Sequence, residues 1–216
     1  MTKGIIIFDA DGTLFDTLAG IYAALEDLHK HFDLGIFNRN DGMKYIGPPI
    51  KDSLMRYNGL TESEAEIATD YYRKVYVEKH IDMSRYYEGA KDVIVALKEQ
   101  GYQIALATMK TFVQVERLFE VTGGRELFDY VENAREDGTY KKHQMIEHIR
   151  DSSRIESVLI IGDTEHDKLA AEMARVEFLG VTYGYGFKQR NSYDFPCKDS
   201  IEELVDFIRK EGICCR

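Results

Sequence analysis

The feature that most constrains this chain is an apolar run that ends abruptly in two acidic residues. Residues 5–17 read IIIFDADGTLFDT, so that Asp9 and Asp11 follow four apolar residues and are separated by one small residue. An apolar run without polar alternation is typical of a strand in a parallel sheet that is covered on both faces. Two carboxylates this close repel each other, and folding gives no reason to place them there. The pair therefore indicates a functional site at the end of the first strand.

Runs of this kind recur along the chain and alternate with helical patterns. Strand followed by helix, repeated several times, predicts an α/β fold in which a parallel sheet has helices on both faces. In the first of these helices Val93, Ile94 and Leu97 form one apolar stripe, and Gly101 is a plausible C-terminal cap. The expected strands span 4–8, 102–108, 130–134, 157–161 and 177–183, and the expected helices of this part span 90–100, 112–121, 144–149, 168–175 and 201–209.

One region interrupts this alternation. Residues 17–83 carry helical patterns only, beginning with an apolar stripe that runs from Leu18 to Phe32. The GPPI segment at 47–50 divides the region, because proline is unfavourable inside a helix. We therefore expect an inserted helical cap over 17–83, with residues 1–16 and 84–216 forming the α/β core.

The charge balance limits the partners of the protein. In 216 residues, 38 acidic side chains outnumber 28 basic ones and give a formal net charge of −10, which argues against nucleic acid as a partner. No stretch approaches the roughly 18 apolar residues of a membrane span, and no basic segment precedes the first strand, so we expect a cytoplasmic protein without a membrane partner. A phosphate group still fits, because charges beyond about 8–10 Å are largely screened and a few local cations suffice.

Polar residues follow the expected strands at the ends where ligands bind in open α/β sheets. Because the carboxyl ends of parallel strands meet at one edge, we expect these side chains to converge. The first strand ends in Asp9 and Asp11, the second in Thr108, Met109 and Lys110, the region after the third holds Lys141 and Lys142, and the fourth runs into Asp163 and Asp167.

Carboxylates crowded in this way need a counter-charge. A ligand set of oxygens only indicates a hard divalent ion, Mg²⁺ rather than zinc. Asp9 and Asp163 are natural ligands of such an ion, and the ion would let Asp9 remain ionised as a nucleophile. The hydroxyl of Thr108 and a lysine ammonium would donate to phosphate oxygens, and Asp11 would act as general acid. The pattern thus predicts phosphate chemistry that passes through an acyl phosphate.

At these residues the sequence resembles the haloacid dehalogenase superfamily. Four motifs of that superfamily occur in order, and the resemblance spans the whole chain. They are DxDGT at Asp9, Asp11, Gly12 and Thr13, a strand-terminal hydroxyl at Thr108, a lysine before a helix, and GDxxxD at Gly162, Asp163 and Asp167. Within the superfamily, IGPP at 46–49 and GVTYGYG at 180–186 look most like the phosphoglycolate phosphatase group.

The resemblance implies a Rossmann-like core with a small helical cap and Mg²⁺-dependent phosphatase activity on a small phosphate ester. It implies a phosphoaspartyl intermediate on Asp9 and acid–base work by Asp11. The metal would be held by the side chains of Asp9 and Asp163 and by the backbone carbonyl of Asp11. Asp167 would orient the lysine or a metal-bound water.

Two positions depart from the family pattern. Met109, a phosphate-binding candidate, stands where many phosphatases of the group have Asn, so a substrate or cap contact is altered. The motif lysine is either Lys141 or Lys142, and neither is followed by the usual proline. We favour Lys142, because its distance to the apolar positions Met145 and Ile146 suits a lysine that enters a helix.

Two other functions remain open at the level of sequence. A sugar phosphomutase of the same superfamily shares every core motif and differs in returning the phosphoryl group to a sugar, so its product would be an isomerised sugar phosphate. A non-catalytic phospho-ligand binding protein would release no phosphate. The substrate and the oligomeric state are not specified by these motifs.

Overall fold

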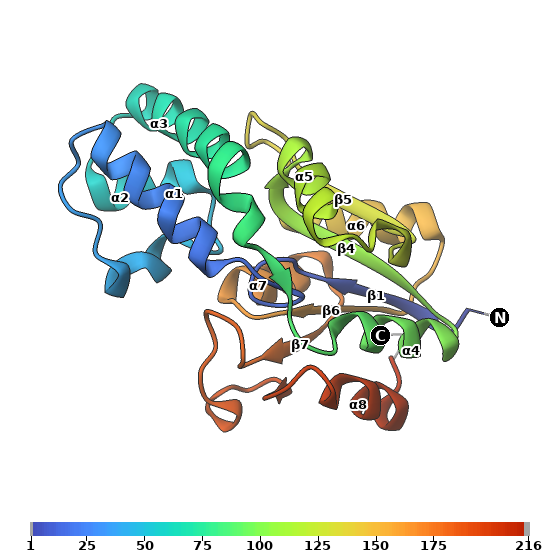
Figure 1. The fold of residues 1–216 in the computed structure, drawn as a ribbon. Helices are drawn as coiled ribbons and strands as arrows, with labels where there is room; N and C mark the ends of the chain where they lie inside the picture. The colour runs from blue at the N-terminus through green and yellow to red at the C-terminus, as the bar shows by residue number, and fades with distance from the viewer. Residues whose placement is uncertain (1, 214–216) are drawn as a thin grey trace.

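The computed structural model describes residues 2–213 and is built around a parallel sheet of six strands. The strand order is β5-β4-β1-β6-β7-β8, and every neighbouring pair is parallel. The predicted α/β fold class is thus confirmed (Figure 1). The strands are β1 (Gly4–Phe8), β4 (Tyr102–Thr111), β5 (Tyr130–Ala134), β6 (Val158–Gly162), β7 (Glu177–Val181) and β8 (Cys197–Lys198).

Helices cover both faces of the sheet, as the unbroken apolar strands require. On one face Ile5 and Ile7 of β1 pack in a cluster with residues of α6 and α7, and on the other Ile6 and Phe8 pack with residues of α4, α5 and α8. The alternation of side chains along β1 therefore fills two separate cores. These helices are α4 (Ala90–Glu99), α5 (Phe112–Thr122), α6 (Lys142–Ser153), α7 (Glu165–Ala174) and α8 (Glu203–Glu211), and the short η4 (Arg125–Leu127) and η5 (Arg190–Ser192) lie in connections.

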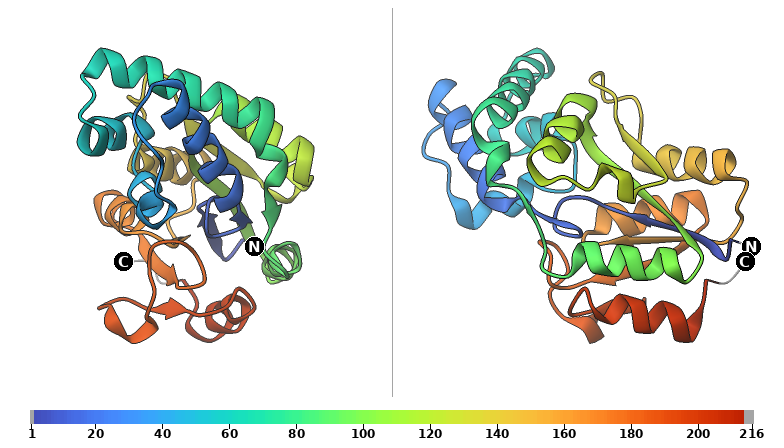
Figure 2. Two further views of the ribbon diagram at one scale, coloured as in Figure 1. Left: turned by 60° about the vertical axis from the view of Figure 1, so that its left-hand side comes forward. Right: turned by 45° about the vertical axis from the view of Figure 1, so that its right-hand side comes forward.

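A helical part between β1 and β4 lies beyond the carboxyl ends of the strands (Figures 1 and 2). It is joined to the core through a short antiparallel pair of strands, β2 (Phe15–Asp16) and β3 (Arg85–Tyr86). We use the word cap for residues 17–83. Its elements are α1 (Leu18–His31), η1 (Arg39–Tyr45), α2 (Ile50–Asn58), α3 (Glu62–Val75), the π-helical turn η2 (Tyr76–His80) and η3 (Ile81–Met83).

Local sequence explains where the cap helices begin and end. Thr61 and Glu64 form a capping box at the start of α3, and Gly59 ends α2 in the left-handed conformation that glycine tolerates best. Pro49 precedes the first residue of α2, where its missing N–H group is not needed. Within residues 2–213, no helix is both long enough and apolar enough to cross a membrane.

Several elements differ at their ends from the ranges expected from sequence, and two of these differences concern the site. Strand β4 continues past Thr108 to Thr111, and its register with β5 shifts between those two residues. Within the cap, helix α3 is α-helical only to Val75 and then widens into the π turn η2. Both differences lie next to the site described below.

Candidate active site

Functional side chains meet at the carboxyl ends of three adjacent strands, β4, β1 and β6. Asp9 directly follows β1, Thr108 lies near the end of β4, and Asp163 directly follows β6. Lys142 is the first residue of α6, and Asp167 lies in the first turn of α7. All five side chains are buried. The structure thus brings the motif residues together. We use the name acidic cluster for Asp9, Asp11, Thr108, Lys142, Asp163 and Asp167.

Lys142 lies at the centre of the acidic cluster. Its Nζ is 2.5 Å from Oδ1 of Asp9 and also donates to Oδ1 of Asp167. Burial alone would lower the pKa of Lys142, but the carboxylates of Asp167 and Asp9 raise that pKa above its ordinary value. Lys141, the other candidate from sequence, has an exposed side chain and precedes the helix. The structure therefore places Lys142, and not Lys141, between the carboxylates.

Asp163 is oriented by the segment 184–186 of the GVTYGYG motif. Its Oδ2 accepts hydrogen bonds from the backbone N–H groups of Tyr185, at 2.6 Å, and Gly186, at 3.4 Å. A Cβ atom on Gly184 would come within 2.5 Å of the Asp163 Cβ, so this close approach requires glycine. Gly12 of the DxDGT motif has φ +79° and also lies against this carboxylate. Both glycine motifs thus hold Asp163 in place.

Three carboxylates in this cluster are close enough to share a cation. Oxygens of Asp9, Asp163 and Asp167 lie within 4.8 Å of one another, and all three residues are buried. Burial and the neighbouring carboxylates raise the pKa of Asp9 well above its ordinary value, while Lys142 opposes this shift. Burial, with Asp167 beside it, raises the pKa of Asp163 to about 7. An oxygen-only, negatively charged and buried set fits a Mg²⁺ ion.

Asp167 has donors of its own within this group. Its Oδ1 accepts from Lys142, and its Oδ2 accepts from the backbone N–H of Thr164, at 3.0 Å, and from the Thr164 hydroxyl, at 2.7 Å. Burial would raise the pKa of Asp167, but Lys142 and these hydrogen bonds lower it. Both of its oxygens are therefore engaged by the protein, which suits a residue that orients Lys142.

Asp11 has different partners from the other carboxylates of the cluster. Its Oδ1 accepts a hydrogen bond from the Thr17 hydroxyl at 2.5 Å and lies 2.9 Å from Nζ of Lys110. The side chain of Asp11 is 22% exposed, whereas that of Lys110 is only 5% exposed. Both residues line the cavity, and Asp11 is the more exposed member of the pair.

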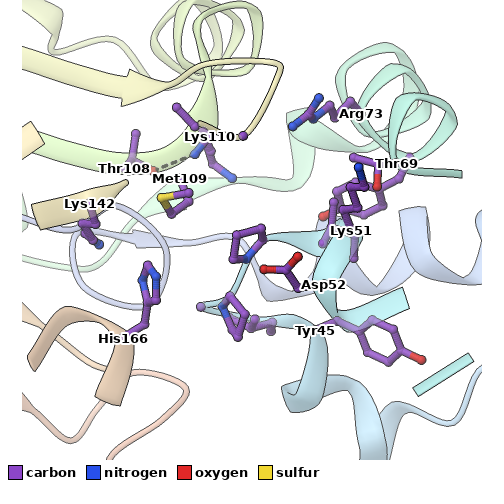
Figure 3. A pocket seen from close by; sticks show the side chains of 18 of the residues that line it. Tyr45, Lys51, Asp52, Thr69, Arg73, Thr108, Met109, Lys110, Lys142 and His166 are labelled. Atoms are coloured by element: carbon purple, nitrogen blue, oxygen red, sulfur yellow. Dashed lines mark hydrogen bonds between the residues drawn. The ribbon is translucent and has the colours of Figure 1, made fainter. Parts of the chain in front are cut away.

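The acidic cluster opens into a cavity of about 460 Å³ between the core and the cap. Core side chains face cap side chains across this space (Figure 3). The IGPP segment at 46–49 also lines the cavity. The labelled core residues are Thr108, Met109, Lys110, Lys142 and His166, and the labelled cap residues are Tyr45, Lys51, Asp52, Thr69 and Arg73.

Comparison with known proteins decides the family. The haloacid dehalogenase-like hydrolase family matches residues 6–181. This chain belongs to that hydrolase family. The hydrolase is 30% identical to pyrophosphatase PpaX of Bacillus velezensis, an alignment that covers 96% of each chain. The family resemblance inferred from the four motifs is therefore confirmed.

Solved structures agree with this assignment. A predicted phosphatase from Clostridium acetobutylicum superimposes on the hydrolase with a TM-score of 0.88 and 29% identity, over 97% of this chain and 100% of that one. A predicted phosphoglycolate phosphatase from Haemophilus somnus shares the fold, with a TM-score of 0.80 and 23% identity, over 95% of this chain and 97% of that one. Proteins described as phosphatases thus share both the fold and the length of this hydrolase.

Lys110 is a residue of the site to which the sequence analysis assigned no role. A lysine after a strand is usually solvated, and no sequence pattern indicates a partner for Lys110. The signal was its position two residues after Thr108: residues i and i+2 of a strand share a face, so both side chains face the same way if the strand continues. The structure does continue β4 to Thr111, and the backbone N–H of Lys110 donates to the Thr108 hydroxyl at 3.2 Å (Figure 3).

Proposed function

We propose that this hydrolase is a Mg²⁺-dependent phosphatase that hydrolyses a small phosphorylated metabolite through an aspartyl-phosphate on Asp9. The observation that carries the proposal is the position of Lys142, whose buried ammonium bridges Asp9 and Asp167 beside Asp163. Folding alone does not favour burying an ammonium and several carboxylates at one sheet edge, because removing charges from water is unfavourable. The same group of charges suits the binding of a dianionic phosphoryl group and a metal ion. Phosphatase relatives support the same reaction class.

The metal would be held by the side chains of Asp9 and Asp163 and by the backbone carbonyl of Asp11. When bound, it supplies positive charge that offsets the negative charge of the carboxylates and of the phosphoryl oxygens. The raised pKa values of Asp9 and Asp163 support this assignment, because burial disfavours both anions, the neighbouring carboxylates disfavour them further, and a bound cation would offset both effects.

The reaction then takes two displacement steps at phosphorus, and residues of the chain act in each of them. In the first, an oxygen of Asp9 forms a bond to phosphorus while the ester P–O bond breaks, and Asp11 gives its proton to the departing oxygen. In the second, Asp11 takes a proton from water as the water oxygen attacks phosphorus, and the Asp9–phosphorus bond breaks. The hydroxyl of Thr108, the backbone N–H of Met109 and the ammonium of Lys142 donate to the phosphoryl oxygens throughout.

The cap selects the substrate and limits the access of water in this proposal. The cavity of about 460 Å³ suits a small metabolite, and its far wall is made by cap residues. We propose residues 17–83 as the specificity unit and residues 1–16 and 84–216 as the catalytic unit.

The test is phosphate release from a panel of sugar, nucleotide and short-acid phosphates, with Mg²⁺ or with a chelator. We expect at least one ester to release free phosphate only with Mg²⁺, and we expect Asp9→Asn to abolish turnover. Isomerised sugar phosphate without free phosphate would establish a mutase instead. Normal turnover by Asp9→Asn would refute the nucleophile, and no turnover of any ester would favour a phospho-ligand binding protein.

A further inference from the structure

Lys110 joins the acidic cluster to the cap. Its Nζ lies 2.9 Å from Oδ1 of Asp11 in the core and donates to the hydroxyl of Tyr76 in the cap at 3.2 Å. The same ammonium lies 4.6 Å from the centre of the Tyr76 ring, within the range of a cation–π contact. Burial alone would lower the pKa of Lys110, but Asp11 and Tyr76 raise it above its ordinary value, so the side chain is a cation. Lys110 therefore contacts both parts of the protein at once.

Tyr76 is held in place by the cap. It is the first residue of the π turn η2, its side chain is fully buried, and its ring stacks on Tyr72 with an interplanar angle of 9°. Its hydroxyl also lies 3.3 Å from the hydroxyl of Ser84. Single π turns inside helices occur frequently at functional sites, where they change the direction of a side chain. Here the turn brings the tyrosine hydroxyl to the core lysine.

A second contact on Asp11 comes from the cap. The hydroxyl of Thr17, at the start of the cap, donates to Oδ1 of Asp11 at 2.5 Å, the same oxygen that faces Lys110. Two donors on Oδ1 fix the rotation of the carboxyl group and direct Oδ2 away from them. Among the residues that the structure describes, no hydrogen bond to Oδ2 is found, so this oxygen is the one available to a substrate.

Stability alone gives little reason for this arrangement. Replacing a buried ion pair by apolar residues of similar size is often neutral or stabilising, because removing charges from water is unfavourable. A lysine that is 5% exposed and bonded to a candidate catalytic carboxyl therefore points to a role in the reaction.

We propose that Lys110, held by Tyr76 of the cap, is a positioning residue that directs Asp11 toward the leaving group and so links the position of the cap to proton transfer. The inference rests on the proposed function, because it assigns Asp11 the task of protonating the departing oxygen. It concerns the orientation of Asp11 and not phosphate or metal binding.

The leaving group of the substrate provides the test. A p-nitrophenolate departs without a proton, whereas an alkoxide needs one, and kcat/KM reports only the steps up to the first irreversible departure. We expect Lys110→Met to lower kcat/KM about 10- to 100-fold for an alkyl phosphate that the wild type hydrolyses, and less than about threefold for p-nitrophenyl phosphate. A merely structural role would lower both values by the same factor.

Tyr76→Phe provides a second variant that keeps the packing of the ring. We expect a smaller loss with the same dependence on the leaving group, about three- to tenfold for the alkyl ester. In the double variant Lys110→Met with Tyr76→Phe the losses should not add, since both act through one contact with Asp11. Fully additive losses would overturn the linkage to the cap. The single variant Tyr76→Phe keeps the proposal testable if Lys110→Met fails to fold.

Lys91→Met is the matched control. Lys91 lies 4.6 Å from the ring centre of Tyr86 and donates to the carbonyl of Thr122, so it makes the same lysine–tyrosine contact without a carboxylate of the acidic cluster. Its kcat/KM should be unchanged with both substrates. Equal losses in an active Lys110→Met enzyme would overturn the positioning role only. A wild-type protein that releases phosphate from no ester of the panel would overturn the proposed function, and this inference with it.

Discussion

Among single residues, Asp163 has a proposed metal-binding role, and its buried charge lowers the free energy of unfolding when no metal is bound. Its folded-state pKa is raised from 3.8 to about 7, so between these values the folded protein binds more protons than the unfolded chain. The contribution of this group to the free energy of unfolding therefore falls as pH rises through that window. At about pH 8 without a divalent ion, we expect Asp163→Asn to be more stable than wild type by about 1–3 kcal/mol. Thermal unfolding in chelator at about pH 5 and pH 8 measures this difference, which should shrink at the lower pH.

Adding Mg²⁺ should reverse the order of the two proteins at about pH 8, because an ion that binds only the folded wild type raises its unfolding temperature. The substitution Asp151→Asn serves as the control, since the Asp151 side chain is 70% exposed. It should change neither the response to pH nor the response to Mg²⁺. If Asp163→Asn gained as much from Mg²⁺ as wild type, Asp163 would not be a ligand.

The acidic residues were predictable from sequence for a physical reason. Asp9 and Asp163 each follow an apolar strand, Thr108 lies near the end of another, and the geometry of a parallel sheet brings such ends together. Lys142 was favoured over its neighbour by its spacing from apolar helix positions, and the structure places it in the cluster. The contact of Lys110 was not predictable in this way, since its partner hydroxyl on Tyr76 is 34 residues distant and local patterns carry no information about it.

At the scale of elements, the packing of α1 against η2 depends on one glycine. Alanine normally stabilises a helix relative to glycine by roughly 0.5–1 kcal/mol. At Gly20, however, a Cβ atom would lie 2.5 Å from the carbonyl oxygen of His80, a backbone atom that no side-chain rotation can move. We expect Gly20→Ala to lower the free energy of unfolding by about 1–2 kcal/mol, because overpacking outweighs helix propensity. Urea unfolding measures the change.

The neighbouring residue provides the control for this prediction. Ala19 lies in the same turn of α1 but is exposed, so Ala19→Gly should lose only the intrinsic propensity of roughly 0.5–1 kcal/mol. A Gly20→Ala protein more stable than wild type would mean that α1 and η2 separate easily, and the π turn could not then hold Tyr76 firmly.

Element types followed from sequence, whereas some of their ends did not. Apolar runs predicted the central strands because both faces of the sheet are covered. The two-residue strands β2 and β3 carry no periodic signal, and their pairing depends on residues 69 positions apart, Asp16 and Arg85. The π turn at Tyr76 continues the apolar pattern of α3, so sequence alone predicts an uninterrupted helix there.

For the whole molecule, the class of fold was predictable but the order of its strands was not. Alternating strands and helices predict a parallel sheet, while several orders of strands satisfy the same alternation. In the observed order, β1 lies between β4 and β6, which places Asp9 between Thr108 and Asp163. Long-range packing of Ile5 and Ile7 on one face and Ile6 and Phe8 on the other accompanies this central position.

The net charge of −10 has a consequence for how the whole protein meets an anionic substrate. Cap cations at the cavity are already paired, Lys51 with Glu62 at 3.1 Å and Arg73 with Asp70 at 3.7 Å, so they do little to offset the long-range repulsion. Raising the ionic strength from about 0.01 M to 0.15 M shortens the screening length from about 30 Å to about 8 Å. At constant free Mg²⁺, we therefore expect kcat/KM for a dianionic phosphate ester to rise about two- to fivefold over this range, with kcat nearly constant because bound substrate no longer has to approach.

Steady-state kinetics against potassium chloride measure both constants, and sucrose at equal osmolality is the control that changes the solvent without screening charge. A fall in kcat/KM with salt would show instead that attraction by cations near the cavity outweighs the field of the whole molecule.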